Sequence, residues 1–167
     1  MRTAICPGSF DPITLGHLNI IRRASRIFDR VVVCVMHNAT KTAPMFSVEE
    51  RVRMVKQTVS KYPNVEVDTS EGLLAEYARK YEGAVVVKGL RAASDFEYEF
   101  QMNLINKKIN PELETMFLTA SEKYTFLSSS VVREMAHYGA ELTGLVPDEI
   151  IGEIEQKAKL WREKHNG

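Results

Sequence analysis

The chain has 167 residues, 44% of them hydrophobic and 26% charged, a composition typical of soluble globular proteins. This length suits one domain with a sizeable core, so a single domain over residues 1–167 is expected. Lys+Arg and Asp+Glu number 22 each, and the resulting net charge of zero argues against a protein whose whole surface binds nucleic acid. Because no run approaches the roughly 20 apolar residues of a membrane span and the first residues lack a signal-peptide layout, we expect no membrane partner and a cytoplasmic location.

Short apolar, β-branched runs alternate with amphipathic segments along the chain. The runs predict strands at residues 3–6, 31–37, 64–68, 84–89 and 114–119. The amphipathic segments predict helices at 17–28, 47–62, 73–81, 95–109, 128–139 and 147–164. This alternation predicts an α/β fold with a doubly wound, parallel five-stranded sheet and a C-terminal helical segment. The strand at 64–68 alternates in polarity, so it is expected near an edge of the sheet.

Cysteines and histidines give no sign of a metal or redox site. Cys6 and Cys34 fall in predicted strands without CxxC spacing, so buried thiols are the simpler interpretation, although a disulfide remains possible. The four histidines lack metal-ligand spacing, and no structural metal is predicted.

In doubly wound sheets, ligands bind beyond the carboxyl ends of the strands, where the winding reverses. The first such loop reads PGSFDPITLGH, from Pro7 to His17. Its glycines allow a ligand to approach the backbone, and the following helix presents unpaired N–H groups, a combination that favours phosphate. His17 would lie beside that phosphate. The alternative is a simple turn followed by a polar histidine in the first turn of a helix.

Cations stand at the later strand ends. Lys88 and Arg91 flank Gly89, as a polyanion site requires, and Lys41 lies in the loop after the second strand. Alternatively, Lys88 and Arg91 pair with Asp95 or Glu97, and Lys41 is solvated. Glu99 could contact a ribose or adenine, or face water.

Three serines, Ser128 to Ser130, precede the helix at 128–139, and one of them is expected to cap it. Arg133, one turn further on, could reach the same anion or pair with Glu134 or Glu141. No acid orients His17 toward Ser9, so a nucleophilic serine is disfavoured. The predicted groups all bind anions, which suits phosphoryl or nucleotidyl transfer by positioning and charge stabilisation.

Three segments, PGSFDPITLGH, KGLRAASDFEYEFQMN and YTFLSSSVVRE, resemble the bacterial phosphopantetheine adenylyltransferases, members of the nucleotidyltransferase superfamily with its [HT]xGH motif. The resemblance implies a Rossmann-like nucleotidyltransferase fold. It also implies adenylyl transfer from ATP to 4′-phosphopantetheine, giving dephospho-coenzyme A and pyrophosphate, with Mg²⁺ bound through ATP phosphates and a homohexamer of dimerised trimers.

The same resemblance implies residue roles. The catalytic residues would be His17, Lys41, Lys88 and Arg91. The ATP-binding residues would be Ser9, Phe10, His17, Gly89, Leu90, Arg91, Glu99, Tyr124, Thr125, Phe126, Leu127, Ser128, Ser129 and Ser130. The residues binding phosphopantetheine would be Ser9, Lys41, Leu73, Leu74, Lys88 and Asn106. Two alternatives remain: a nicotinamide-mononucleotide adenylyltransferase, and a non-catalytic nucleotide sensor.

Overall fold

The computed structural model describes residues 1–37 and 43–165 of the chain. Its centre is a parallel sheet of five strands in the order β3-β2-β1-β4-β5. The strands are β1 (Thr3–Gly8), β2 (Arg30–Met36), β3 (Val65–Ser70), β4 (Val85–Leu90) and β5 (Glu114–Thr119). The predicted doubly wound parallel sheet is confirmed, and β3 is an edge strand, as its alternating polarity predicted.

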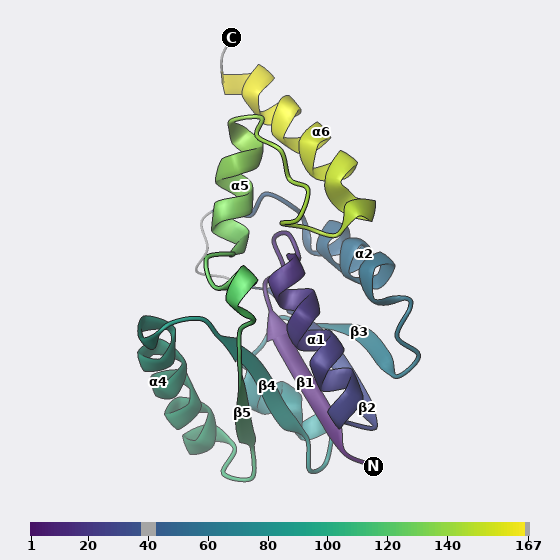
Figure 1. Ribbon diagram of the computed structural model, residues 1–167. Coiled ribbons are helices and arrows are strands. Elements are labelled where there is room, and N and C mark those ends of the chain that lie inside the picture. The colour runs from purple at the N-terminus through teal and green to yellow at the C-terminus, as the bar shows by residue number, and fades with distance from the viewer. Residues whose placement is uncertain (38–42, 166–167) are drawn as a thin grey trace.

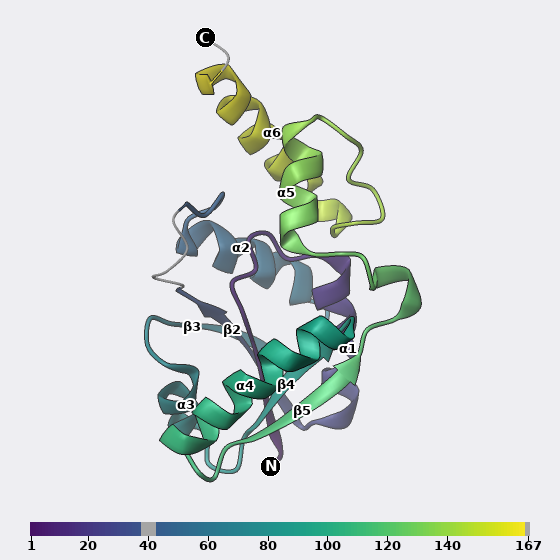
Figure 2. The same ribbon diagram turned by 90° about the vertical axis from the view of Figure 1, so that its left-hand side faces the viewer.

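Helices cover both faces of the sheet. They are α1 (Leu15–Ile27), α2 (Val48–Val59), α3 (Leu74–Tyr77), the 3₁₀ turn η1 (Ala78–Lys80), α4 (Ala93–Ile109), the 3₁₀ turn η2 (Glu122–Tyr124), α5 (Ser129–His137) and α6 (Asp148–His165). Helices α1 and α2 lie on one face, and α3 and α4 lie on the other (Figures 1 and 2). Helices α5 and α6 extend past the carboxyl ends of the strands, where α6 contacts both α5 and α2 (Figure 1).

Successive strand residues point to opposite faces, so the strands serve two cores. Ala4 and Cys6 of β1 join the larger core with α1, α2, α5 and α6, whereas Ile5 between them joins the smaller core under α3. Cys6 and Cys34 are both buried free thiols, as predicted. Strands buried on both faces require continuous apolar sequence, which is why these runs are easily found in the chain.

Element boundaries differ from the prediction mainly where the chain turns sharply. The helix expected at 73–81 is one α-helical turn followed by a 3₁₀ turn. Helix α1 begins at Leu15, earlier than the expected residue 17, because Thr14 caps it. The predicted capping box of Ser47 and Glu50 opens α2, and Ser128 caps α5. Among the described residues, none of the helices combines the length and apolar character that crossing a membrane requires.

Candidate active site

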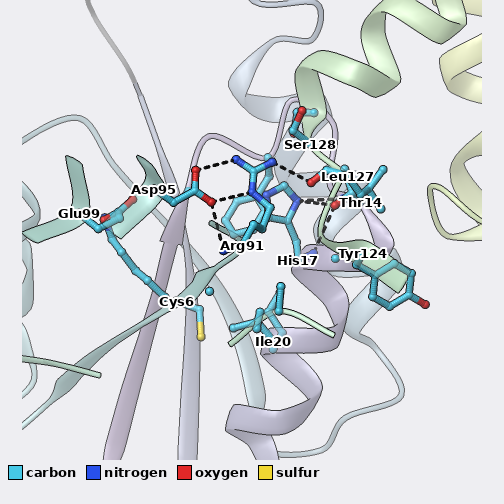
Figure 3. Close-up of a pocket in the computed structure, with 18 of the residues that line it drawn as sticks. Cys6, Thr14, His17, Ile20, Arg91, Asp95, Glu99, Tyr124, Leu127 and Ser128 are labelled. Carbon is cyan, nitrogen blue, oxygen red and sulfur yellow. Dashed lines mark hydrogen bonds and ion pairs between the residues drawn. The ribbon is translucent and has the colours of Figure 1, made fainter. Parts of the chain in front are cut away.

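From β1 the chain proceeds to β2 and β3 on one side of the sheet. It then crosses to the other side of β1, where it forms β4 and β5, so the winding reverses at β1 and β4. The carboxyl ends of β1 and β4 open into a cavity of about 580 Å³. Its walls come from these two strands, α1, α4 and residues 120–129 (Figure 3). The cavity therefore lies at the reversal point where the fold predicts a ligand.

The first turn of α1 fixes the imidazole of His17. Thr14 is the N-cap residue, and its hydroxyl accepts a hydrogen bond from the His17 N–H at 3.3 Å. In return, the Thr14 backbone N–H donates to His17 Nδ1 at 3.0 Å (Figure 3). Because Nδ1 accepts this hydrogen bond, the ring proton resides on Nε2. The imidazole is thus held as a donor at the positive end of a helix.

Phe10 packs its ring against this imidazole. The two ring centroids are 5.1 Å apart in an edge-to-face arrangement, and Phe10 is buried. Phe10 has a φ of 49°, in the left-handed region that non-glycine residues rarely adopt. A Cβ atom at position 8 would come within 3.1 Å of the Phe10 ring, so a larger residue there would require the ring to shift. The loop is shaped around the Phe10 ring, which supports His17 from the side.

Two cations reach the cavity from β4 and the residue after it, and each is paired with a carboxylate of α4. Lys88 Nζ donates to Glu99 at 2.5 Å, and both side chains are about one-fifth exposed. Arg91 binds both carboxylate oxygens of Asp95, at 2.9 and 3.2 Å, and donates to the Leu127 carbonyl at 2.9 Å (Figure 3). The Arg91 guanidinium lowers the pKa of the Asp95 carboxyl below its ordinary value. The alternative that these cations form ion pairs is therefore correct for Asp95, which pairs with Arg91. Lys88 pairs with Glu99 rather than with the suggested partner Glu97.

Asp11 is a buried hub beneath the first loop. Its carboxylate accepts hydrogen bonds from the backbone N–H groups of Met45 and Phe46, at 3.0 and 2.9 Å. Arg133 of α5 lies 3.6 Å from the same carboxylate and donates to the Asp11 carbonyl at 2.7 Å. Arg133 therefore pairs with neither Glu134 nor Glu141, the partners suggested by the sequence. This network ties the loop after β1 to α5.

Arg51 of α2 is a buried cation that supports the same loop. Its Nη1 donates to the carbonyls of Ser9 at 2.7 Å and Met36 at 3.2 Å, and its Nε donates to the Ser47 carbonyl at 3.3 Å. Among the described residues, none of its hydrogen-bond partners is a carboxylate. Arg51 thus joins the carboxyl ends of β1 and β2 to the start of α2.

Cys6 lines the cavity but has no reactive character. Burial raises the pKa of its thiol to about 12, so the thiol stays protonated at neutral pH.

Comparison with known proteins identifies the family. A cytidylyltransferase-like family model matches residues 5–135. The chain is 51% identical to the phosphopantetheine adenylyltransferase of Caldanaerobacter subterraneus subsp. tengcongensis, over 95% of this chain and 99% of the relative. It is 50% identical to the enzyme of that name from Clostridium botulinum, over 98% of this chain and 99% of the relative. The chain belongs to the phosphopantetheine adenylyltransferase family.

A solved structure supports the fold of this phosphopantetheine adenylyltransferase family member. A chain described as a nicotinate-nucleotide adenylyltransferase from Vibrio parahaemolyticus superposes with a TM-score of 0.70. The match covers 97% of this chain and 96% of that chain, at 20% identity. Because the identity is low, this likeness speaks for the nucleotidyltransferase fold alone.

The cavity brings together many of the residues to which the family resemblance gave a role. The predicted site residues that line it are Phe10, His17, Lys88, Gly89, Arg91, Glu99, Tyr124, Leu127, Ser128 and Ser129. The predicted residues outside its lining are Ser9, Leu73, Leu74, Leu90, Asn106, Thr125, Phe126 and Ser130. Lys41 lies outside the residues that the structure describes.

Sequence reasoning gave no site role to Asp11 or Arg51. It named Asp95 as an alternative ion-pair partner, and Asp95 stands four residues after Arg91 at the spacing of a helical ion pair. Asp11 and Arg133 are 122 residues apart, and the partners of Arg51 in the described part of the chain are carbonyl groups, so neither leaves a local signal.

Proposed function

We propose that this chain transfers the adenylyl group of ATP to 4′-phosphopantetheine, releasing pyrophosphate and forming dephospho-coenzyme A. The observation that carries the proposal is the identity of about half its residues, over nearly the whole chain, with proteins named for this activity. A phosphate oxygen of phosphopantetheine attacks the α-phosphorus of ATP, and the bond from that phosphorus to the pyrophosphate oxygen breaks. No covalent bond to the protein is formed.

Charge stabilisation is the chemistry that the cavity supports. Negative charge builds on the α-phosphate oxygens as the new bond forms, and donors already fixed in place stabilise it most. His17 is proposed as such a donor: Thr14 holds Nδ1, so the ring proton is on Nε2, the atom assigned to a ligand oxygen. The amino end of α1 adds a partial positive charge at the same place.

Lys88 and Arg91 are proposed to receive the reacting phosphates. Both cations line the cavity, as His17 does. Lys88 would neutralise the attacking phosphate of phosphopantetheine, whereas Arg91 would bind ATP phosphates. Lys41 is assigned to the phosphopantetheine phosphate with Lys88 as part of this proposal. Ser9, Gly89, Leu90, Glu99 and residues 124–130 complete the proposed ATP site, and Leu73, Leu74 and Asn106 the pantetheine site.

Mg²⁺ is proposed to accompany ATP, coordinated by its phosphates and by water, as is common in nucleotide-binding enzymes. The groups at the cavity fit that arrangement, because the two carboxylates nearest the cations, Asp95 and Glu99, already bind Arg91 and Lys88. When bound, the ion would neutralise charge on the phosphates, and the protein residues would position them.

Self-association and a cytoplasmic location belong to the same proposal. Helix α4 turns large apolar side chains outward, each between 46% and 62% exposed: Phe96, Tyr98, Phe100, Leu104 and Ile105. Grouped exposed apolar side chains often mark a contact surface, so they support contact between copies of the chain in a homohexamer.

A coupled pyrophosphate assay tests the proposed reaction. Purified protein with ATP and Mg²⁺ is offered phosphopantetheine, nicotinamide mononucleotide, or pantoate with β-alanine in parallel. Pyrophosphate release with phosphopantetheine alone is the expected result. Release with nicotinamide mononucleotide would reassign the substrate, and ATP binding without release would indicate a nucleotide sensor.

A further inference from the structure

A second cavity, of about 360 Å³, lies on the outer face of α1. One wall is Lys61 and Tyr62, in the connection between α2 and β3, and the opposite wall is Ser121, Lys123 and Tyr124. The floor is a single helical face, formed by Leu15, Leu18, Asn19 and Arg22 at spacings of three and four residues. Three segments far apart in the sequence thus meet around one hollow.

Positive charge gathers in this cavity without a counter-charge. Arg22, Lys61 and Lys123 line it, and its lining contains no Asp or Glu. None of the three forms an ion pair within the described part of the chain, where many other cations are paired. In a molecule with no net charge, such a group produces a local positive potential that attracts anions.

Neighbouring rings hold the two ammonium groups. Lys61 Nζ lies 5.7 Å from the centroid of the Tyr62 ring, and Lys123 Nζ lies 5.0 Å from that of Tyr124. These contacts favour the charged amine while leaving its N–H groups available as donors.

Asn19 adds an uncharged donor to the floor. Ser121 Oγ donates to Asn19 Oδ1 at 3.0 Å, which ties the wall to α1. With its oxygen engaged, the amide of Asn19 has its NH₂ group left for a ligand.

We propose that this cavity binds a phosphate-bearing small molecule, at a site separate from the catalytic cavity. Its volume falls within the usual range for small-molecule sites. One guanidinium, two ammonium groups and an amide donor suit phosphate oxygens, and the tyrosine rings with Leu15 and Leu18 suit an apolar portion. Helix α1 separates the two cavities, and Tyr124 borders both.

Lysine footprinting of the full-length protein tests this site. Amine acylation is followed by mass spectrometry of peptides while inorganic pyrophosphate, and separately ATP, is titrated. Lys61 and Lys123 should lose labelling together over one concentration range, whereas exposed Lys159 on α6 should not. Labelling of Lys88 in the same experiment reports ligand binding at the catalytic cavity. A lack of binding at the catalytic cavity can thereby be distinguished from a lack of binding at the second cavity. Protection by pyrophosphate identifies an inorganic ligand, and protection by ATP alone identifies a nucleotide.

Two variants of α1 make the test specific. Arg22→Gln should raise the concentration for half-protection of Lys61 and Lys123 about tenfold and leave that of Lys88 unchanged, because one charge-assisted contact is lost. Arg26→Gln, also exposed on α1 but outside the cavity, is the matched control and should change neither. The proposal is overturned if Lys61 and Lys123 are not protected, if sodium chloride at equal ionic strength protects them equally, or if both variants shift alike.

Discussion

Single side chains at the proposed catalytic cavity are held by specific partners within the protein. The imidazole of His17 accepts a hydrogen bond from Thr14, Lys88 contacts Glu99, and Arg91 forks onto Asp95. Preorganised groups of this kind lose little freedom when a charged ligand arrives, so they stabilise a transition state effectively. Substitutions of these single residues can therefore separate chemical roles from structural ones.

Two substitutions of His17 should separate its role in capping α1 from its proposed role in adenylyl transfer. His17→Ala should lower kcat about 100- to 1,000-fold, the usual effect of losing one fixed donor to an oxyanion. His17→Gln is the matched variant, because glutamine at this position completes an ordinary capping box with Thr14 and should restore stability. Thermal unfolding and pyrophosphate release would be measured for both. A His17→Ala enzyme with near-normal turnover would remove His17 from the mechanism.

Lys88 should act on the acceptor substrate. Lys88→Ala is expected to raise KM for phosphopantetheine and to lower kcat, together by about tenfold or more, since it removes a charge-assisted hydrogen bond. Lys107→Ala is the control, because Lys107 forms a comparable ion pair with Glu114 away from the cavity. Steady-state kinetics with each substrate varied would decide, and a loss of ATP affinity alone would contradict the assignment.

The ion pair of Arg91 and Asp95 should affect how the stability of the protein changes at acidic pH. Because the pKa of Asp95 is lowered in the folded protein, the pair stabilises the fold above the ordinary value of 3.8, and that stabilisation is lost as pH falls through the folded pKa. Arg91→Ala should therefore raise the pKa of Asp95, followed by carboxyl NMR, and reduce the stability lost between pH 5 and pH 3.

Arg30→Ala is the control for that experiment. It should raise the pKa of Glu66, whose carboxyl it contacts, and leave Asp95 unchanged. An unaltered Asp95 titration in Arg91→Ala would show that the guanidinium does not hold this carboxylate.

At the scale of elements, α1 and β4 approach each other closely at the cavity wall. A Cβ atom added at Gly89 would lie 2.9 Å from Ile20 Cγ1, closer than side chains pack. The end of β4 can thus lie against α1 only because position 89 lacks a side chain. This contact helps to set the distance between His17, on α1, and the cations on either side of Gly89, Lys88 and Arg91.

Gly89→Ala should therefore strain this contact. We expect a loss of about 1–3 kcal/mol in the free energy of unfolding, typical of overpacking. Adding Ile20→Ala should recover part of it, giving a coupling of at least about 0.5 kcal/mol in a double-mutant cycle from urea unfolding. Gly72→Ala, with open space around it, should be nearly neutral. Strict additivity of the first two changes would show that the contact is unimportant.

The elements themselves were largely predictable, because buried parallel strands have continuous apolar sequence and caps such as Ser47 with Glu50 mark helix starts. The rule that ligands bind beyond the carboxyl ends of the strands directed attention to the cations Lys88 and Arg91. The long-range partners could not be predicted: Asp11 contacts Arg133 across 122 residues, and Arg51 donates to the carbonyl groups of Ser9, Met36 and Ser47. Such contacts depend on tertiary packing that leaves no local pattern in the chain.

At the scale of the whole molecule, the unusual feature is that α4 exposes apolar side chains and buries a polar one. Five of its large apolar residues are exposed, while Asn106 is buried and Glu99 lines the cavity. A helix with this arrangement is expected to be covered by another copy of the chain, as the proposed hexamer requires.

A charge placed on this surface should break the assembly. Phe100→Glu is expected to shift the sedimentation velocity profile from the hexamer to smaller species, because a buried unpaired carboxylate is strongly disfavoured. Leu160→Glu on α6 is the matched control, since Leu160 is exposed to a similar degree. A hexamer that tolerates Phe100→Glu, or dissociates equally with Leu160→Glu, would place the interface elsewhere.

Lys88 and Arg91 are each paired with a carboxylate, Glu99 and Asp95, that would compete with a ligand for the same cation. If these cations receive phosphates as proposed, a phosphate would displace the carboxylate, which could pair with its cation again when the product leaves. Partly exposed pairs of this kind contribute about 1 kcal/mol or less each, so the competition would weaken ligand binding only a few-fold. Product release would be favoured to the same modest extent.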